Sequence, residues 1–295
     1  MLRSNERIAG AIALVLAVLH QLLDQLSGTD LAAQLARASF AREAPFAPVD
    51  FSWYGGIHPF GYSLLSPWVM AALGVGLSGI LAAVLGAVLF ARLVRDLERP
   101  VLVGSLGAVF SVADVVSGRT TFALGAVALL GALLCRERRG WPIVLGVLTG
   151  LLSPVAAAFL GFCAAVLVLH RRPGGWTLGL SAALPVVGVG VLFPGGGIQP
   201  FDFASASAGL AVALGLAVVA TLPIVRTASL LYALAILVFC LRADAFGSNV
   251  LRLGLLVSAP VALTNYRRGA LLGVVVVGSL AWQVDPMHGD LTDGP

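Results

Sequence analysis

The chain has 295 residues, of which 59% are hydrophobic and only 11% are charged. A water-soluble protein of this length needs far more surface charge, and no separate soluble domain fits between the apolar runs. The net charge of +4 comes from 18 basic residues, all of them arginines that flank those runs, which is typical of topology signals and argues against nucleic-acid binding. The composition therefore predicts an all-α protein, a polytopic transmembrane helical bundle.

Apolar runs of helical length follow one another along the whole chain. The first comes after Arg3 and Arg7 and resembles a signal peptide, but no small-residue cleavage site follows it, so we expect an uncleaved first helix. We predict a single integral membrane domain over residues 1–295 with about 10–11 membrane segments. The expected segments are residues 8–26, 67–91, 100–116, 122–135, 142–152, 155–169, 176–193, 205–224, 227–241, 253–266 and 270–284.

Residues 142–169 decide how often the chain crosses the membrane. As one helix this stretch would be about 42 Å long, which is long for one crossing and short for two. Pro154 at its centre favours a broken or re-entrant pair of helices, because proline lacks a backbone donor and disfavours helix at the preceding residue. With such a pair 13 of the 18 arginines fall on one side, whereas a single crossing gives a split of 10 to 8. The positive-inside rule then predicts a bacterial plasma-membrane (inner-membrane) protein with a cytoplasmic N-terminus.

This orientation places residues 27–66 outside as a long loop and residues 285–295 outside as a short tail. The loop starts with an expected interfacial helix, in which Leu31, Leu35 and Ala38 share a face and Arg37 can lie toward lipid headgroups. A simple linker explains the same residues equally well.

The second half of this loop combines rings, glycines and prolines around one carboxylate. Asp50, Trp53, Tyr54, His58 and Tyr62 all lie within thirteen positions. Flat rings stack on sugar faces, and a carboxylate can orient or deprotonate a hydroxyl, so the mixture suits a saccharide. The alternative is an aromatic belt at the membrane interface, with Asp50 as a helix or turn cap.

Four more polar residues are candidates for a site on the outer side. Asp114 and Arg119 flank the tight connection between two segments, and ionisable residues at membrane depth tend to face a partner or a watery cavity. Arg252 follows Asn249 by three residues, which puts both on one face if the segment is helical. Because a guanidinium binds phosphate through its fork of donors, a lipid phosphate is a natural ligand. The alternatives are a salt bridge between Asp114 and Arg119, and Asn249 as a cap of the following helix.

Five short motifs are similar to those of a known group of proteins; they are residues 53–67, 117–125, 152–155, 193–197 and 248–253. On these motifs the chain resembles a set of actinobacterial multi-pass membrane proteins, which in turn resemble the GT-C superfamily of glycosyltransferases that use polyprenyl-phosphate sugars. The likeness extends over nearly the whole chain.

The resemblance implies a role for the first outer loop. In GT-C enzymes this loop carries an acidic residue that acts as a base or binds a metal, and Asp50 is the matching position. Many relatives have an acidic pair where this chain has one carboxylate, so a divalent metal would lack a ligand cluster and we expect no cofactor. Members of the set continue into an extracytoplasmic C-terminal part, whereas eleven residues follow Val284 here, which implies a short version.

The resulting expectation is a glycosyltransferase that moves a sugar from a polyprenyl-phosphate donor to a glycan or lipid acceptor on the extracytoplasmic face. Arg119 and Arg252 would hold the lipid phosphate, Asp50 would activate the acceptor hydroxyl, and the rings of residues 53–58 would shape the sugar pocket. Its partners would be membrane lipids, the donor and the acceptor. The alternatives are a transporter or lipid flippase, whose pathway Asp114, Arg119 and the broken helix would line, and a non-catalytic membrane assembly subunit.

Overall fold

The structure is a computed structural model that describes residues 3–23, 28–52, 62–194, 197–242, 244–264 and 269–292. Within these ranges the chain is all-α, with thirteen α-helices, the 3₁₀ helix η2 and no strand. The helices are α1 (Ser4–Leu23), α2 (Leu31–Glu43), α3 (Ser66–Leu73), α4 (Val75–Leu93), α5 (Pro100–Val116), α6 (Thr120–Leu134), α7 (Trp141–Leu152), α8 (Pro154–Leu169), α9 (Gly175–Leu192), α10 (Phe203–Val219), α11 (Pro223–Leu241), η2 (Gly247–Val250), α12 (Leu251–Ala262) and α13 (Ala270–Thr292).

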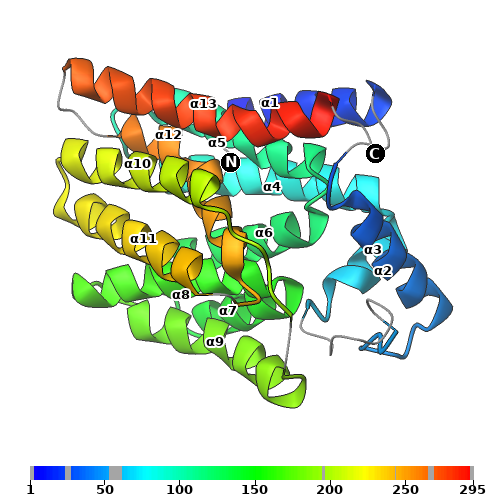
Figure 1. The fold of residues 1–295 in the computed structure, drawn as a ribbon. Coiled ribbons are helices and arrows are strands. Elements are labelled where there is room, and N and C mark those ends of the chain that lie inside the picture. Colours follow the sequence, from blue (N-terminus) through cyan, green and yellow to red (C-terminus); the bar gives the residue numbers. More distant parts are fainter. Residues whose placement is uncertain are drawn as a thin grey trace.

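The long helices lie side by side in one bundle, and α2 and α3 lie together at one end of it (Figure 1). Each segment expected from the sequence contains a helix, but two differ from the expectation. Residues 67–91 are not one helix, because Gly74 has a φ of +83° and separates α3 from α4. The helix expected to end at residue 284 is longer, because α13 continues past Pro286 to Thr292.

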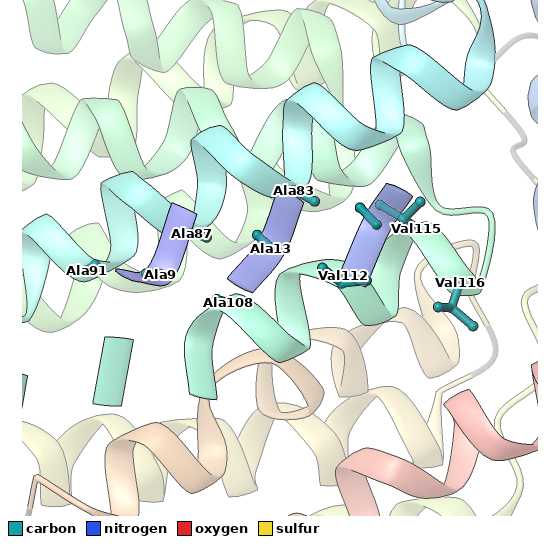
Figure 2. Packing of buried hydrophobic residues seen from close by; sticks show 10 residues of the cluster. Ala9, Ala13, Ala83, Ala87, Ala91, Ala108, Val112, Val115 and Val116 are labelled. Carbon is teal, nitrogen blue, oxygen red and sulfur yellow. The ribbon is translucent and has the colours of Figure 1, made fainter. Parts of the chain in front are cut away.

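Small residues form the centre of the bundle. Along α1 the fully buried Ala9, Ala13 and Ala17 recur every four residues, and they pack against the equally spaced alanines Ala83, Ala87 and Ala91 of α4. Figure 2 shows this cluster where α1, α4 and α5 meet. Because side chains at i and i+4 share a helix face, the small side chains let the three backbones approach closely.

Large apolar side chains are turned outward instead. Leu180, Leu184, Val187 and Val191 on α9 are all more than half exposed, and Val191 reaches 74%. Among the helices of the described ranges, four (α1, α4, α9 and α11) are long and apolar enough to cross a membrane, judged by length and composition alone. Alanines are thus frequent in the interior beside a smaller number of large residues such as Leu160 and Leu178, and many large apolar residues face outward, unlike the surface of a water-soluble protein.

The break expected at Pro154 is present, and the chain reverses direction there. Ser153 is extended between α7 and α8, and its side chain accepts a hydrogen bond from Ala156 N at 3.2 Å. Both helices pack on α9. Along α7, Gly146 and then Gly150 lie against Ser181 and then Pro185, whereas along α8, Ala164 and then Val168 lie against Gly179 and then Gly175. Since α7 runs parallel to α9 and α8 runs antiparallel to it, the two form a helical hairpin with Ser153 at its tip.

Two side chains from other helices bond to the backbone of α12. The Tyr232 hydroxyl accepts a hydrogen bond from Gly254 N at 3.0 Å and lies 3.1 Å from Val250 O. The Gln283 carboxamide accepts from Ala259 N at 3.0 Å and donates to Leu255 O at 2.6 Å. Each side chain thus binds the donor and the acceptor of one i→i−4 pair, which ties α12 to α11 and α13.

Candidate functional site

The candidate site is at the end of the bundle where α2 begins. Two glycines with positive φ, Gly28 and Gly118, lie backbone to backbone there. A Cβ on either glycine would collide with the segment that contains the other. Asp30 N donates to Ser117 O at 3.2 Å across the same contact. The close approach fixes Asp30 beside the start of α6.

Three charged side chains from separate parts of the sequence meet there, and we call Asp30, Arg119 and Arg252 the ion cluster. Arg252 Nη2 lies 2.9 Å from Asp30 Oδ2, and Arg119 Nε lies 3.7 Å from the same oxygen. Both arginine side chains are 17% exposed, so the cluster is largely shielded but still reaches the surface. The sequence predicted that Arg119 and Arg252 belong to one site but did not single out Asp30, which joins them.

Asp114 lies below the ion cluster at the end of α5. Its carboxylate is buried and is within electrostatic reach of Asp30, Arg119 and Arg252. Its backbone carbonyl accepts a 2.7 Å hydrogen bond from Arg119 N, which closes the turn between α5 and α6. The side chain lines a cavity of about 80 Å³, and apart from Asp114 and Ser111 its walls are apolar residues of α4, α5, α6, α8 and α12. A polar end and an apolar slot therefore adjoin.

Asn249 is used locally. It lies in η2, just before α12, and its Nδ2 donates to Phe246 O at 2.9 Å. The residue preceding α12 is Val250, which provides no side-chain cap. The amide of Asn249 therefore closes the turn that leads into α12, and Arg252 in the first turn of that helix is the group that extends to the ion cluster.

A second polar group forms under α2, next to the ion cluster. Arg37 is only 3% exposed; its Nη2 donates to Ser63 O at 2.7 Å and to Ser63 Oγ at 2.9 Å, and its Nη1 donates to Thr121 Oγ1 at 3.3 Å. The guanidinium carbon lies 4.3 Å from the centroid of the Tyr62 ring. Burial lowers the pKa of Arg37 to about 10, and the nearby Tyr62 and Asp50 charges oppose this shift.

The expectation that Arg37 lies toward headgroups is therefore wrong. On α2, Gln34, Arg37 and Ala38 are buried, whereas Leu35 is exposed. Thr121 and Ser63 explain this, because they offer hydrogen bonds that let a glutamine and an arginine turn inward. Thr121 Oγ1 donates to Gln34 Oε1 as part of the same network.

Asp50 lies at the edge of this group. Its Oδ1 accepts hydrogen bonds from Ser52 N at 2.9 Å and from Ser52 Oγ at 2.6 Å, the geometry of an Asx turn. Asp50 and Arg37 also line a small cavity of about 20 Å³ together with Leu64 and Trp68. Asp50 therefore does cap a turn, which was the alternative to a catalytic role, and its carboxylate remains partly exposed.

The aromatic candidates are only partly covered by the structure. Trp53, Tyr54 and His58 lie outside the described residues, whereas Tyr62 is described and packs on Arg37. The chain beyond Tyr62 is anchored on the α7–α8 hairpin: Leu64 N and Leu65 N both donate to Leu151 O, and Ser66 Oγ donates to Leu152 O. The carbonyls freed by the helix break therefore hold the end of the first loop.

The described part of the chain contains no set of side chains arranged to bind a metal ion. No group of three or more His, Cys, Asp or Glu side chains converges there. Asp30 is paired with two arginines, which repel a cation, and Asp50 is bonded to Ser52. Within the described residues, the contacts available to these side chains are those of charge pairing and hydrogen bonding.

Comparison of the chain with protein-family models, with curated proteins and with solved structures finds no match.

Proposed function

We propose that this chain is a multi-pass membrane protein that transfers a sugar from a polyprenyl-phosphate donor on the extracytoplasmic face, in the manner of GT-C glycosyltransferases. The α7–α8 hairpin places two helices, an even number, between α6 and α9. The arginine-rich connections before and after the hairpin therefore stay on one side. That side is the cytoplasmic one by the positive-inside rule, and it includes the N-terminus. The ion cluster then lies on the opposite, extracytoplasmic side.

The membrane location is supported by the packing of the bundle. Alanines and glycines fill the helix interfaces, and leucines and valines cover the outer faces of helices such as α9. In water such a surface would be an aggregation hazard, whereas in lipid it costs nothing because the tails are as apolar as leucine.

The observation that carries the proposal is the convergence of Arg119 and Arg252 on Asp30 above an apolar cavity. Two guanidiniums at one carboxylate form a site that already holds an anion, and a phosphate has the same preference for bidentate arginine donors. The lining of the cavity below the cluster is apolar except for Asp114 and Ser111, which suits the start of a hydrocarbon chain. A phosphate linked to a polyprenyl chain has both properties.

Asp50 is the proposed base for the acceptor hydroxyl. Its carboxylate is on the loop that adjoins the ion cluster through Arg37 and Thr121, and it keeps acceptor capacity beyond the bonds to Ser52. Trp53, Tyr54 and His58 are proposed to shape the sugar pocket, with Tyr62 held in place on Arg37.

A second candidate function, a transporter or lipid flippase, is favoured by one observation. Asp114 is buried within the bundle and lines a cavity, as expected for an ionisable residue on a transport pathway. The two functions differ in their product: a transferase leaves the sugar on the acceptor, whereas a flippase moves the intact lipid to the other leaflet.

The first experiment measures binding of a polyprenyl phosphate without a sugar to the purified protein by native mass spectrometry. Arg119→Gln and Arg252→Gln are each expected to weaken binding about tenfold or more, because a charge-assisted contact is worth about 1.5–3 kcal/mol. Arg242→Gln is the matched control, since Arg242 is exposed and on the same proposed side. Equal binding by all variants would show that the phosphate does not bind at the ion cluster.

The second experiment tests Asp50 by transfer of labelled sugar from polyprenyl-phosphate donors to membrane-extracted acceptors. Asp50→Asn is expected to abolish transfer with donor binding intact, whereas Ser52→Ala, which removes only one hydroxyl bond to Asp50, is expected to retain it. Full transfer by Asp50→Asn would exclude this carboxylate as the base. Labelling of Ser52→Cys in intact cells, with the native cysteines replaced, tests the side of the membrane; access only from the cytosol would contradict the proposed orientation.

A further inference from the structure

A cavity of about 210 Å³ lies toward the other end of the bundle, where α8 ends and α11 begins. Residues of α8, α10, α11 and α12 enclose it, among them Phe162, Leu216, Val225, Tyr232 and Val261. Nearly all of its lining is apolar, and several lining residues, such as Phe162 and Ala228, are only half-buried. The cavity is thus an apolar slot between helices with access from the outer surface of the bundle.

One polar atom inside this slot lacks a partner. Ser258 on α12 is 1% exposed and lines the cavity, and its hydroxyl has no hydrogen-bond partner among the described atoms. Buried hydroxyls are nearly always hydrogen-bonded, so an occupant with an acceptor atom at this depth would satisfy Ser258. An alkane alone would not, whereas the ester carbonyl of an acyl lipid would.

Three arginines at the helix ends next to the slot form what we call its rim, although none of them lines the cavity itself. Arg171 and Arg172 follow α8, and Arg226 is in the first turn of α11, where its Nη2 donates to Ala220 O at 3.1 Å; all three are exposed. His170 Nε2 and Thr227 Oγ1, 3.0 Å apart, connect the same two helix ends. The sequence has no Asp or Glu between Glu137 and Asp202 or between Asp202 and Asp244, so no acidic side chain of α8 to α11 neutralises this rim.

We propose that the slot binds one acyl chain of an anionic phospholipid. The ester carbonyl accepts a hydrogen bond from Ser258, and the phosphate lies among Arg171, Arg172 and Arg226 at the rim. This site is separate from the ion cluster, with which it shares no residue. It rests on the membrane location that is part of the proposed function, but not on sugar transfer.

The test is photolabelling of the full chain in phosphatidylcholine vesicles that contain a tracer lipid with a diazirine on one acyl chain. The tracer is either phosphatidylglycerol or phosphatidylcholine, and labelled peptides are mapped by mass spectrometry. We expect label from phosphatidylglycerol to concentrate on residues 162–166, 224–232 and 253–261 relative to the exposed face of α9. Each of Arg171→Gln, Arg172→Gln and Arg226→Gln is expected to lower that label about fivefold, in line with about 1 kcal/mol for an arginine near an anionic headgroup.

A variant that fills the slot provides an independent check. Ala228→Phe places a ring in the cavity and is expected to remove the concentrated label, whereas Leu234→Phe on the exposed face of α11 is expected to leave it unchanged. Because the arginine variants are on the surface, they test the site even if Ala228→Phe fails to fold.

The outcomes separate the two proposals. Label spread evenly over α9 and the slot, or equal labelling by both tracers, would overturn the anionic-lipid site while leaving the chain in the bilayer. No label on any helix would contradict the membrane location itself.

Discussion

Arg252 and Asp30 are 222 positions apart in the sequence, and their side chains meet at 2.9 Å. Arg252 comes from the first turn of α12 and Asp30 from the turn that precedes α2, so this one contact joins the last third of the chain to the first loop. Because Arg119 reaches the same carboxylate oxygen, Asp30 is where three separate segments are tied together.

Replacing Arg252 by glutamine is expected to destabilise the protein by about 1–2 kcal/mol, because it removes a charge-assisted bond that is only partly exposed to solvent. The measurement is unfolding of the purified protein in detergent, followed by tryptophan fluorescence. Arg242→Gln, at an exposed position, should change stability by less than about 0.5 kcal/mol. Equal losses for the two variants would mean that the Asp30 contact contributes nothing.

Replacing Arg37 by methionine is expected to cost about 1–3 kcal/mol, because Ser63 and Thr121 lose a buried donor. The fold lowers the pKa of Arg37 to about 10, so this guanidinium is charged in both states near neutrality and contributes no pH dependence there. A pH dependence of stability is expected only at alkaline pH. Folding favours the neutral form of Arg37, so above pH 10 the wild type gains stability as the pH rises toward the unfolded-state pKa. The difference between wild type and Arg37→Met should therefore be constant over about pH 6–8. Arg42→Met, an exposed neighbour on α2, is the control, and a loss of the same size there would contradict a specific role for Arg37.

The helices could be predicted because the residues that determine each helix are close together in the sequence. Apolar length gave the segments, and Pro154 gave the hairpin, since a missing backbone donor acts within one turn. The break at Gly74 was missed, because an isolated glycine in an apolar run leaves the period intact and becomes a break only when its φ is positive. The continuation of α13 through Pro286 was also missed. Proline was expected to end the helix, but α13 tolerates the backbone N–H that Pro286 lacks.

The site was only half predictable. Arg119 and Arg252 were identified as candidates because charge is rare in apolar sequence, but nothing local links them to Asp30, which is one of several acids in the outer segments. The buried turn of α2 was misjudged because Arg37 looks like a surface residue until Ser63 and Thr121, distant in sequence, supply acceptors. Partner identity depends on tertiary contacts that hydropathy does not record.

Substitution of Gly125 by valine is expected to destabilise the protein by about 1–3 kcal/mol, because a side chain there has no room. A Cβ at this position of α6 would lie closer than van der Waals contact to Ser153 and Ala156, so the hairpin tip would be pushed off α6. Gly161→Ala on α8 is the matched control, since nothing lies within 4 Å of its Cβ and alanine favours helix. We expect it to be neutral or slightly stabilising in the same unfolding measurement. A stable Gly125→Val would argue against close packing of the hairpin on α6.

Substitution of Gln283 by leucine tests whether α13 holds α12 in position. The leucine keeps the volume but leaves Ala259 N and Leu255 O without the carboxamide, at an expected cost of about 1–3 kcal/mol. Amide hydrogen exchange in the peptide covering α12 should become faster, whereas Val277→Leu, on the exposed face of α13, should leave it unchanged. Because α12 carries Arg252, looser α12 is also expected to weaken polyprenyl-phosphate binding. Unaltered exchange in α12 together with wild-type stability would show that the Gln283 bonds do not support this helix.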